Sequence, residues 1–419
     1  MIQKMRGTLD ILPEQTPAFT YIEKTAREIC ERYGYREIRT PTFEATELFS
    51  RGVGSTSDVV QKEMYTFPDK EGRSLTLRPE GTASVVRAMI EHGRCGGVMP
   101  EKLFYLINCF RYEAPQAGRS REFFQFGTET FGSPSPYTDA TIIALANDVI
   151  RALGIRDVAL HLNSIGCPAC RPRYRQALYE YFSQYKSELC ETCRGRLETN
   201  PLRILDCKSP VCGRIAAGAP KTLDYLCDDC REHFETLKGS LSDLGIPFEI
   251  DTHLVRGLDY YTKTVFEFIC GGIGAQSTVC GGGRYDGLVR ELGGPDLPAA
   301  GFGMGITRLI LAMEQAGAEI PQPKSPLLYI APLGAEAAKK AVTLTHGLRA
   351  AGIAAECDLM GRSLKSQMKY ADKIGAAHTL ILGSSELENG RGVLRRMADG
   401  EQREVGFSDA ETLAKELLS

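Results

Sequence analysis

The sequence has no apolar run long enough to cross a bilayer, no low-complexity tract and no repeat of fixed period. We therefore expect neither a membrane protein nor a repeat array. The chain also lacks a charge excess, because 50 basic residues nearly balance 53 acidic ones and leave a net charge of -3. Such a balance argues against a chromatin-like binder of polyanions, although a local basic face can still hold RNA.

The first residues, MIQKMRGTLDILP, lack the apolar core of a signal peptide and carry an acidic residue early. We therefore expect a cytoplasmic protein. In that compartment the 14 cysteines are better explained as thiols, metal ligands or core residues than as a disulfide framework. A length of 419 residues exceeds one ordinary hydrophobic core and predicts two or three domains.

Hydrophobic spacing predicts an α+β first domain over residues 1–320, with an antiparallel sheet and flanking helices. Apolar residues at helical spacing predict an opening helix over 18–33. Two alternating stretches around a polar loop predict a long hairpin, and three further stretches also fit strands. The predicted strands are 102–113, 123–132, 254–269, 276–289 and 301–307.

Two segments divide the rest of the chain. Residues 167–237 interrupt the first domain as a helical, cysteine-rich insertion. Three prolines in IPQPKSP predict a stiff linker, which we place at 321–326. The βαβαβ alternation that follows predicts a small α/β domain over 327–419.

Polar residues recur along the hairpin where a core would need apolar ones. A period of two places Gln125, Gly127 and Glu129 on one face, and Arg111 and Glu113 share a face of the partner strand. This pattern fits a solvent-exposed sheet face. It equally fits a polar floor beneath a charged ligand.

Arginines recur beside glycine-bearing turns. Arg119 lies in the hairpin loop near Gln116, Arg256 opens RGLDYY, and Arg308 follows GMGIT. An isolated arginine more often forms a surface ion pair than a ligand contact. Recurrence at such positions favours contacts to phosphates or to a polynucleotide end.

The insertion carries cysteines in four closely spaced pairs. Two thiolates a few residues apart can bind one ion, and tetrahedral zinc takes two such pairs. We expect one or two structural zinc ions, and the alternative is reduced cysteines packed among helices. The cysteines are Cys167, Cys170, Cys190, Cys193, Cys207, Cys212, Cys227 and Cys230.

Taken together, these motifs resemble class II aminoacyl-tRNA synthetases, and specifically the histidyl-tRNA synthetase family. The resemblance covers nearly the whole chain, and the α/β tail is similar to the family's anticodon-binding domain. It implies a homodimer with residues 37–49 near its interface. The motifs are RGTLDILP, TLRPEGTASVVR, FRYE, REFFQFGTETFG, LVRGLDYYTKTVFEF, GGGRYDGL and GFGMGITRL.

The resemblance implies activation of L-histidine by ATP with Mg2+ to histidyl-adenylate, then transfer to the 3′ end of tRNA(His), releasing AMP and pyrophosphate. A carboxylate attacks phosphorus in this reaction, so fixed cations must offset concentrated negative charge. By similarity, Arg111 holds the α-phosphate, Arg308 the γ-phosphate, and Arg256 lies near the α-phosphate and the substrate carboxylate. Arg119 is a further expected ATP contact, and Gln116 and Arg119 are expected at the tRNA acceptor end.

The resemblance also implies a histidine pocket, for which ordinary core packing of the tyrosines is the alternative. Two positions depart from the family pattern, Ala114, where arginine is common, and Phe124. These departures affect the loop that would read the acceptor end, not adenylation. The implied contacts are Glu80, Thr82 and Gln125 to the α-ammonium, Glu129 and Tyr261 to the imidazole, and Tyr260 and Tyr285 along the walls.

Two other functions fit the same fold. One is a non-catalytic, synthetase-like regulatory subunit of histidine biosynthesis, a class that tends to lack the arginine motif and the anticodon-binding domain. This chain has Arg256, Arg308 and the complete α/β tail. The other is a synthetase-like enzyme that aminoacylates a different acceptor, which residues alone do not distinguish.

Overall fold

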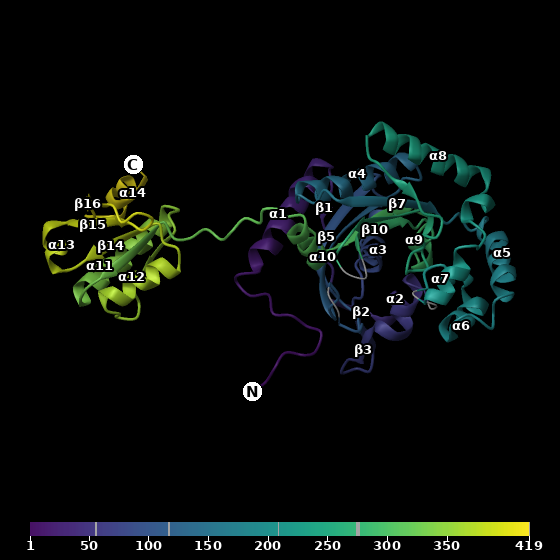
Figure 1. The fold of residues 1–419 in the computed structure, drawn as a ribbon, viewed down its shortest axis with the longest axis horizontal. Helices are drawn as coiled ribbons and strands as arrows, with labels where there is room; N and C mark the ends of the chain where they lie inside the picture. Colours follow the sequence, from purple (N-terminus) through teal and green to yellow (C-terminus); the bar gives the residue numbers. More distant parts are fainter. Residues whose placement is uncertain (55–56, 116–117, 208, 274–276, 419) are drawn as a thin grey trace. The chain divides into compact units, whose positions relative to one another are not determined.

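The computed structural model describes residues 1–54, 57–115, 118–207, 209–273 and 277–418. The chain forms two compact units, Met1–Pro321 and Gln322–Ser419 (Figure 1). Among the described residues, no helix combines the length and apolar character that crossing a membrane requires. Each unit has its own hydrophobic core.

The first unit is built on a large, mainly antiparallel sheet, which confirms the α+β prediction. Parallel pairing occurs at its two edges, where β1 joins β5 and β8 joins β7. A small sheet, β2 (Phe43–Ala45), β4 (Ser74–Leu77) and β3 (Tyr65–Pro68), lies apart from it. The order in the large sheet is β1 (Arg36–Glu37), β5 (Glu101–Phe110), β6 (Glu122–Phe131), β11 (Ala299–Gly305), β10 (Thr278–Arg284), β9 (Thr262–Cys270), β7 (Val158–Ser164) and β8 (Glu249–Ile250).

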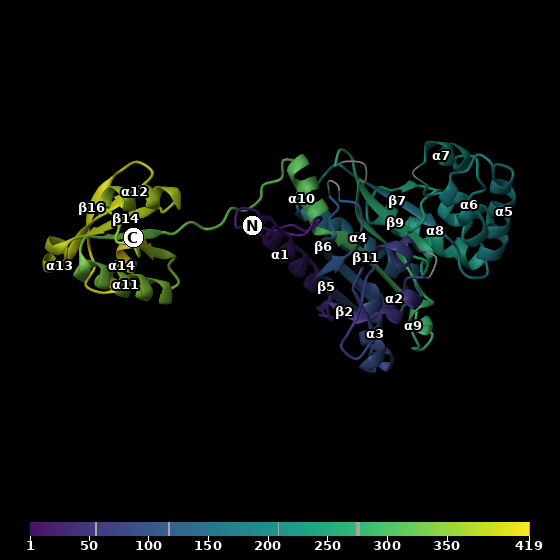
Figure 2. The ribbon, with the colours of Figure 1, turned by 90° about the horizontal axis from the view of Figure 1, so that it is seen from below.

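Helices cover the large sheet and also form the insertion between β7 and β8 (Figures 1 and 2). Side chains of α1, α4, α8 and α10 pack on one face of the sheet in a single apolar cluster. The helices of this unit are α1 (Thr16–Arg32), α2 (Thr46–Gly52), α3 (Thr82–Glu91), α4 (Pro136–Ala152), α5 (Arg171–Ser183), α6 (Glu191–Thr199), α7 (Pro210–Ala216), α8 (Asp228–Asp243), α9 (Leu288–Glu291) and α10 (Ile306–Gln315).

The predicted hairpin is present as β5 and β6, paired in a regular antiparallel register from Glu101 opposite Phe131 to Phe110 opposite Glu122. Alternate side chains of β5 reach opposite faces, as strand geometry requires. Phe104 joins the apolar cluster beneath α1 and α4, whereas Tyr105 belongs to the cluster on the other face. The hairpin thus separates an apolar face from the face that carries polar groups.

The prediction of one strand over 254–269 is wrong in its first half, because β9 begins only at Thr262. Residues before it contact the insertion instead of a neighbouring strand. The backbone carbonyl of Arg256 accepts from Arg203 Nη1 at 3.1 Å, and that of Tyr261 accepts from Arg171. Side chains from a remote segment therefore occupy backbone groups that a strand would pair.

The second unit is a five-element α/β alternation extended by an antiparallel edge. Parallel β13, β12 and β14 agree with the predicted βαβαβ pattern, and β15 and β16 add antiparallel strands that the sequence reading missed. Helices α11 and α14 share one core, while α12 contributes to another. The elements are β12 (Leu328–Pro332), α11 (Ala335–Ala350), β13 (Ala355–Cys357), α12 (Leu364–Lys373), β14 (His378–Leu382), α13 (Ser384–Asn389), β15 (Arg391–Arg396), β16 (Gln402–Gly406) and α14 (Ala410–Leu418).

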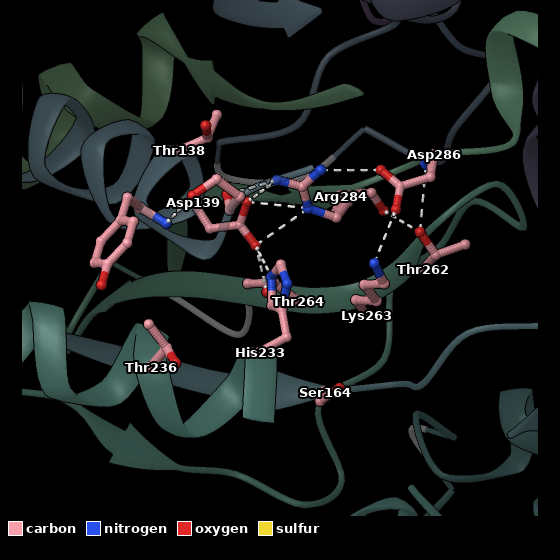
Figure 3. A network of polar contacts seen from close by, with 12 residues as sticks. Thr138, Asp139, Ser164, His233, Thr236, Thr262, Lys263, Thr264, Arg284 and Asp286 are labelled. Carbon is pink, nitrogen blue, oxygen red and sulfur yellow. Dashed lines mark hydrogen bonds and ion pairs between the residues drawn. The ribbon is translucent and has the colours of Figure 1, made fainter. Parts of the chain in front are cut away.

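A buried ionic network ties the large sheet to two of its covering helices (Figure 3). Arg284 of β10 is fully buried, and its Nε donates to Asp139 Oδ1 of α4 at 3.1 Å. The other carboxylate oxygen, Asp139 Oδ2, lies 2.8 Å from His233 Nε2 of α8 and accepts from Thr264 Oγ1 at 2.6 Å. Burial alone would raise the pKa of Asp139, but Arg284 and His233 bring that pKa below its usual value. The carboxylate therefore stays ionised.

Removing Arg284 should leave Asp139 buried without its main counter-charge. Arg284→Ala is expected to lower the free energy of unfolding by about 3–5 kcal/mol, as when one partner of a buried ion pair is lost. Urea denaturation of the full chain measures this. Arg290→Ala, which removes an exposed arginine paired with Asp296, should change it by less than about 0.5 kcal/mol. A loss below about 1 kcal/mol for Arg284→Ala would show that the network does not hold the sheet to its helices.

Candidate functional site

A cavity of about 570 Å³ opens above one end of the large sheet. It is lined by the four arginines predicted to lie at the ATP site, which come from distant segments of the chain: Arg111, Arg119, Arg256 and Arg308. The two acidic residues in contact with them, Glu113 and Glu267, line the same space. Several positive groups, with acidic partners, therefore surround one cavity.

Arg111 and Arg119 are held by groups at the end of the hairpin. Arg111 Nε donates to the backbone carbonyl of Pro79 at 2.8 Å, and its guanidinium lies 5.4 Å from the ring centroid of Phe123. Arg119 Nη1 lies 2.6 Å from Glu113 Oε2. Backbone, ring and carboxylate contacts thus fix the direction of both side chains.

Arg308 reaches the cavity from the first turn of α10. Its Nη1 donates to the carbonyl of Thr278 at 2.8 Å, and its Nε donates to the carbonyl of Gly118 at 3.3 Å. Burial lowers the pKa of Arg308 below its ordinary value, and the neighbouring charges of Arg119 and Arg111 lower it further. Arg111, Arg119 and Arg308 thus line the same cavity close enough to repel one another.

Arg256 pairs with Glu267 of β9, whose second oxygen accepts from Thr278 Oγ1 at 2.7 Å. Burial opposes its charge, but the Glu267 carboxylate outweighs this effect and the pKa of Arg256 lies above its usual value. A Cβ on Gly281 would come within 2.3 Å of the Arg256 guanidinium. Glycine in GGGR therefore provides the space that this side chain fills.

A second cluster, fully buried, surrounds the Glu129 carboxylate on β6. Thr82 Oγ1 donates to Glu129 Oε1 at 2.7 Å and Tyr105 Oη donates to the same atom at 3.0 Å, while Tyr285 donates to Oε2. Burial raises the pKa of Glu129 to about 8, against the lowering effect of these hydroxyls. The alternative prediction, that this face of the strand is exposed to solvent, is therefore wrong at Glu129.

Glu80 lies beside this cluster at the start of α3. Its carboxylate accepts from the backbone nitrogens of Thr82 at 2.6 Å and Ala83 at 2.9 Å, which satisfies two free donors of the first helical turn. Burial nevertheless raises the pKa of Glu80. Two buried carboxyl groups, Glu80 and Glu129, thus lie near one another, and a cation bound there would favour their ionised forms.

Tyr260, Tyr261 and Tyr285 pack together against the same cluster. The centroids of the Tyr260 and Tyr261 rings are 4.7 Å apart, and Tyr285 lies edge-on to both. The Arg256 guanidinium lies 5.7 Å from the Tyr261 centroid. Arg256 also lines the cavity, so it links the group of arginines to the buried tyrosines.

Sequence reasoning missed Tyr105. A Cβ on Gly127 would come within 2.4 Å of the Tyr105 hydroxyl, and one on Gly301 within 2.2 Å of Glu129 Oε2. The single glycine of FQFGTE and the alternating glycines of GFGMG were the available signal, because a strand residue without a side chain leaves room for a large polar neighbour. Glu113 and Glu267 were also missed as the partners of the arginines.

The remaining predicted residues lie in different parts of the first unit. Gln116 lies outside the described residues. Phe124 lines the cavity and packs edge-on against Phe19 of α1, with centroids 5.4 Å apart. Ala114 is exposed beyond β5. The insertion cysteines gather as two groups of four, Cys167, Cys170, Cys227 and Cys230, and Cys190, Cys193, Cys207 and Cys212.

Comparison with known proteins gives one consistent family. A family model described as histidyl-tRNA synthetase matches residues 7–169 and 214–309, and one described as an anticodon binding domain matches residues 328–417. The histidine–tRNA ligase of Acetivibrio thermocellus is 53% identical over 97% of this chain and 98% of its own. That of Moorella thermoacetica is 55% identical over 97% of this chain and 96% of its own.

Solved structures agree with this assignment. The crystal structure of apo S. aureus histidyl-tRNA synthetase has 40% identity and a TM-score of 0.84, with 100% of each chain covered. A Bacillus halodurans structure described as an ATP phosphoribosyltransferase regulatory subunit/histidyl-tRNA synthetase is 24% identical with a TM-score of 0.66, covering 92% of this chain and 99% of its own, and shares the fold. The regulatory-subunit alternative is not favoured, because relatives at about half identity along the chain are histidine–tRNA ligases. On these matches, this chain belongs to the histidyl-tRNA synthetase family.

Proposed function

We propose that this protein activates L-histidine with ATP and transfers the histidyl group to the 3′ end of tRNA(His), releasing pyrophosphate and AMP. The observation that carries the proposal is the convergence of Arg111, Arg119, Arg256 and Arg308 on one cavity beside a buried pair of carboxylates. A triphosphate supplies the negative groups that the arginines bind. Histidine supplies an ammonium and an imidazole, which are suitable partners for the carboxyl groups.

Each arginine has a distinct part in adenylate formation. Arg111 holds the α-phosphate, Arg308 the γ-phosphate, and Arg119 adds a further contact to ATP, which enters as its Mg2+ complex. Arg256 lies between the cavity and the tyrosines, where the histidine carboxylate attacks the α-phosphorus. Its fixed charge offsets the negative charge that builds in the transition state, without solvent reorganisation.

Histidine occupies the buried cluster. Glu80, Thr82 and Gln125 face its α-ammonium, and Glu129 and Tyr261 form hydrogen bonds to the imidazole nitrogens. Tyr260 and Tyr285 wall the pocket, and Tyr285 also orients Glu129. A ligand without these donors and acceptors would leave buried polar groups unpaired, which is the physical basis of selectivity.

Other parts of the chain serve tRNA binding and assembly. We place the catalytic domain at 1–320, its insertion at 167–237 and the anticodon-binding domain at 327–419, joined by a linker at 321–326. Gln116 and Arg119 contact the acceptor end. The active form is a cytoplasmic homodimer, and the insertion holds structural zinc.

Histidine-dependent exchange of pyrophosphate into ATP, followed by charging of purified tRNA(His), tests the reaction. We expect both activities with histidine and neither with the other standard amino acids. Absence of exchange would favour the regulatory function, and exchange without charging of tRNA(His) would indicate a different acceptor.

Arg256→Gln should lower kcat/KM for pyrophosphate exchange by about 10²–10³-fold, the usual cost of removing a preorganised donor from a transition state. Arg256→Lys should recover only part of this loss, because an ammonium cannot form the guanidinium fork. Arg290→Ala serves as the matched control with an exposed arginine. Activity of Arg256→Gln within about threefold of wild type, far short of the expected loss, would contradict the role given to Arg256.

The protonation of Glu129 should appear in the pH dependence of histidine use. Because burial raises the pKa of Glu129 to about 8, its carboxyl is mostly protonated at neutral pH and accepts poorly from the imidazole N–H. We expect kcat/KM for histidine to rise from about pH 7 toward pH 8. The rise is distinct from the titration of the substrate imidazole, whose usual pKa is about 6.5. Glu129→Gln should remove this rise. The same rise in the variant, or a flat wild-type profile, would contradict the proposal that protonation of Glu129 limits histidine use.

A further inference from the structure

Each group of four insertion cysteines has the dimensions of a metal centre. Within each group the sulfur atoms all lie within 4.8 Å of one another. The separations are 3.6 Å for Cys167 to Cys170, 3.9 Å for Cys167 to Cys227, and 3.8 Å for Cys190 to Cys207. Four thiolates in a tetrahedron around zinc, at about 2.3 Å from the ion, lie about 3.8 Å apart. A disulfide would require about 2.05 Å.

Backbone N–H groups already point at the sulfurs. The N–H of Cys227 donates to Cys170 Sγ at 3.1 Å, and that of Cys190 donates to Cys212 Sγ at 3.3 Å. Helices α5, α6 and α8 each begin directly after a cluster cysteine. Four thiolates around a divalent ion leave two negative charges, which backbone donors and helix N-termini stabilise.

The two groups are nested along the chain. The outer group, Cys167, Cys170, Cys227 and Cys230, joins the segment that leaves β7 to the start of α8, so it closes the neck of the insertion. Apolar support at the neck is small, since its cluster adds only Leu226 and Leu223 to the cysteines among the described residues. The inner group, Cys190, Cys193, Cys207 and Cys212, joins α6 to α7 and lies wholly between the two stretches matched by the family model.

We propose that the insertion holds two separate Zn2+ ions, each bound by four thiolates, one in the outer group and one in the inner group. Sulfur ligands in tetrahedral positions select zinc among the common divalent cations of a cell interior. Since the neck has little apolar core, the outer ion supplies the cross-link that fixes the insertion to the sheet.

The two ions also position the segment that carries Arg256 and Tyr261, a part of the proposal that rests on the function given above. Arg171, next to Cys170, donates to the carbonyl of Tyr261. Arg203, between the two halves of the inner group, donates to the carbonyl of Arg256 at 3.1 Å and lies 3.3 Å from Asp58 Oδ2. For each centre, an arginine from the surrounding segment therefore forms a hydrogen bond to the backbone of the catalytic segment.

Metal analysis of the full chain, purified under reducing conditions without a chelator, tests the sites directly. We expect about two zinc ions per chain by elemental analysis and by native mass spectrometry. Replacement with Co2+ should give the visible absorption bands of tetrahedral sulfur coordination at two equivalents. One ion per chain or iron in place of zinc would overturn the proposal. So would a metal-free chain whose eight insertion cysteines all titrate as thiols, or a mass lower by the hydrogens lost in disulfides.

Single substitutions separate the two centres. Cys230→Ser should remove the outer ion only and Cys193→Ser the inner ion only, leaving about one zinc per chain in each case. Cys95→Ser, which changes a half-buried cysteine outside both groups, should keep both ions. If a variant fails to fold, the cobalt titration of the wild-type chain still decides the number of sites.

The positioning effect needs a variant that keeps both ions. Arg203→Ala should retain two zinc ions and lower kcat for pyrophosphate exchange about tenfold, with KM for ATP little changed, as expected when a supporting contact is lost. Arg203→Lys should restore part of this loss, and Arg194→Ala, an exposed arginine of α6, should have no effect. Unchanged kcat in Arg203→Ala would overturn the positioning role. Zinc without any exchange in the wild type would instead contradict the proposed function, and exchange without zinc would contradict the metal sites.

Discussion

Like charges held around one cavity are the constraint on which this structure depends. Arg111, Arg119, Arg256 and Arg308 come from separate segments and would repel one another if they were free to move. Backbone carbonyls of Pro79, Gly118 and Thr278 accept from them, and the carboxylates of Glu113 and Glu267 partly balance their charge. These contacts fix the positions of the four guanidinium groups, although the cavity is also lined by acidic residues, Glu113, Asp206, Asp251 and Glu267. A triphosphate supplies the anion that the guanidinium groups can bind.

The two faces of the large sheet differ in what they bury. One face carries a continuous apolar core under α1, α4, α8 and α10, and the buried pair of Arg284 with Asp139 ties strand to helix there. The other face has an apolar cluster too, and within it lie tyrosines, buried carboxyls and the glycines that make room for them. The second face also holds buried carboxyls such as Glu129, whose raised pKa is a cost to folding.

Much of this arrangement follows from local sequence pattern, and the remainder depends on distant contacts. The alternation along 102–132 predicted the hairpin, and the spacing of the insertion cysteines predicted groups of ligands. The pattern over 254–261 misled, because Arg171 and Arg203 of the insertion take the backbone carbonyls that pairing would have used. Tyr105 lies in a strand of ordinary appearance. Glycines in neighbouring strands indicate room for a large side chain, but the contacts of Tyr105 with Gly127 and Glu129 in the folded chain identify which one fills it. Partners such as Glu267 are identified by tertiary proximity, which spacing in one sequence does not encode.

A crystal structure of the chain with a non-hydrolysable analogue of histidyl-adenylate tests the central claim most directly. We expect the imidazole to lie against Glu129 and Tyr261. The group that replaces the α-phosphate should lie within hydrogen-bond distance, about 3 Å, of Arg111 and Arg256. An analogue bound elsewhere, or bound in this cavity with Arg111 and Arg256 turned away from it, would contradict the assignment of these arginines to the chemistry.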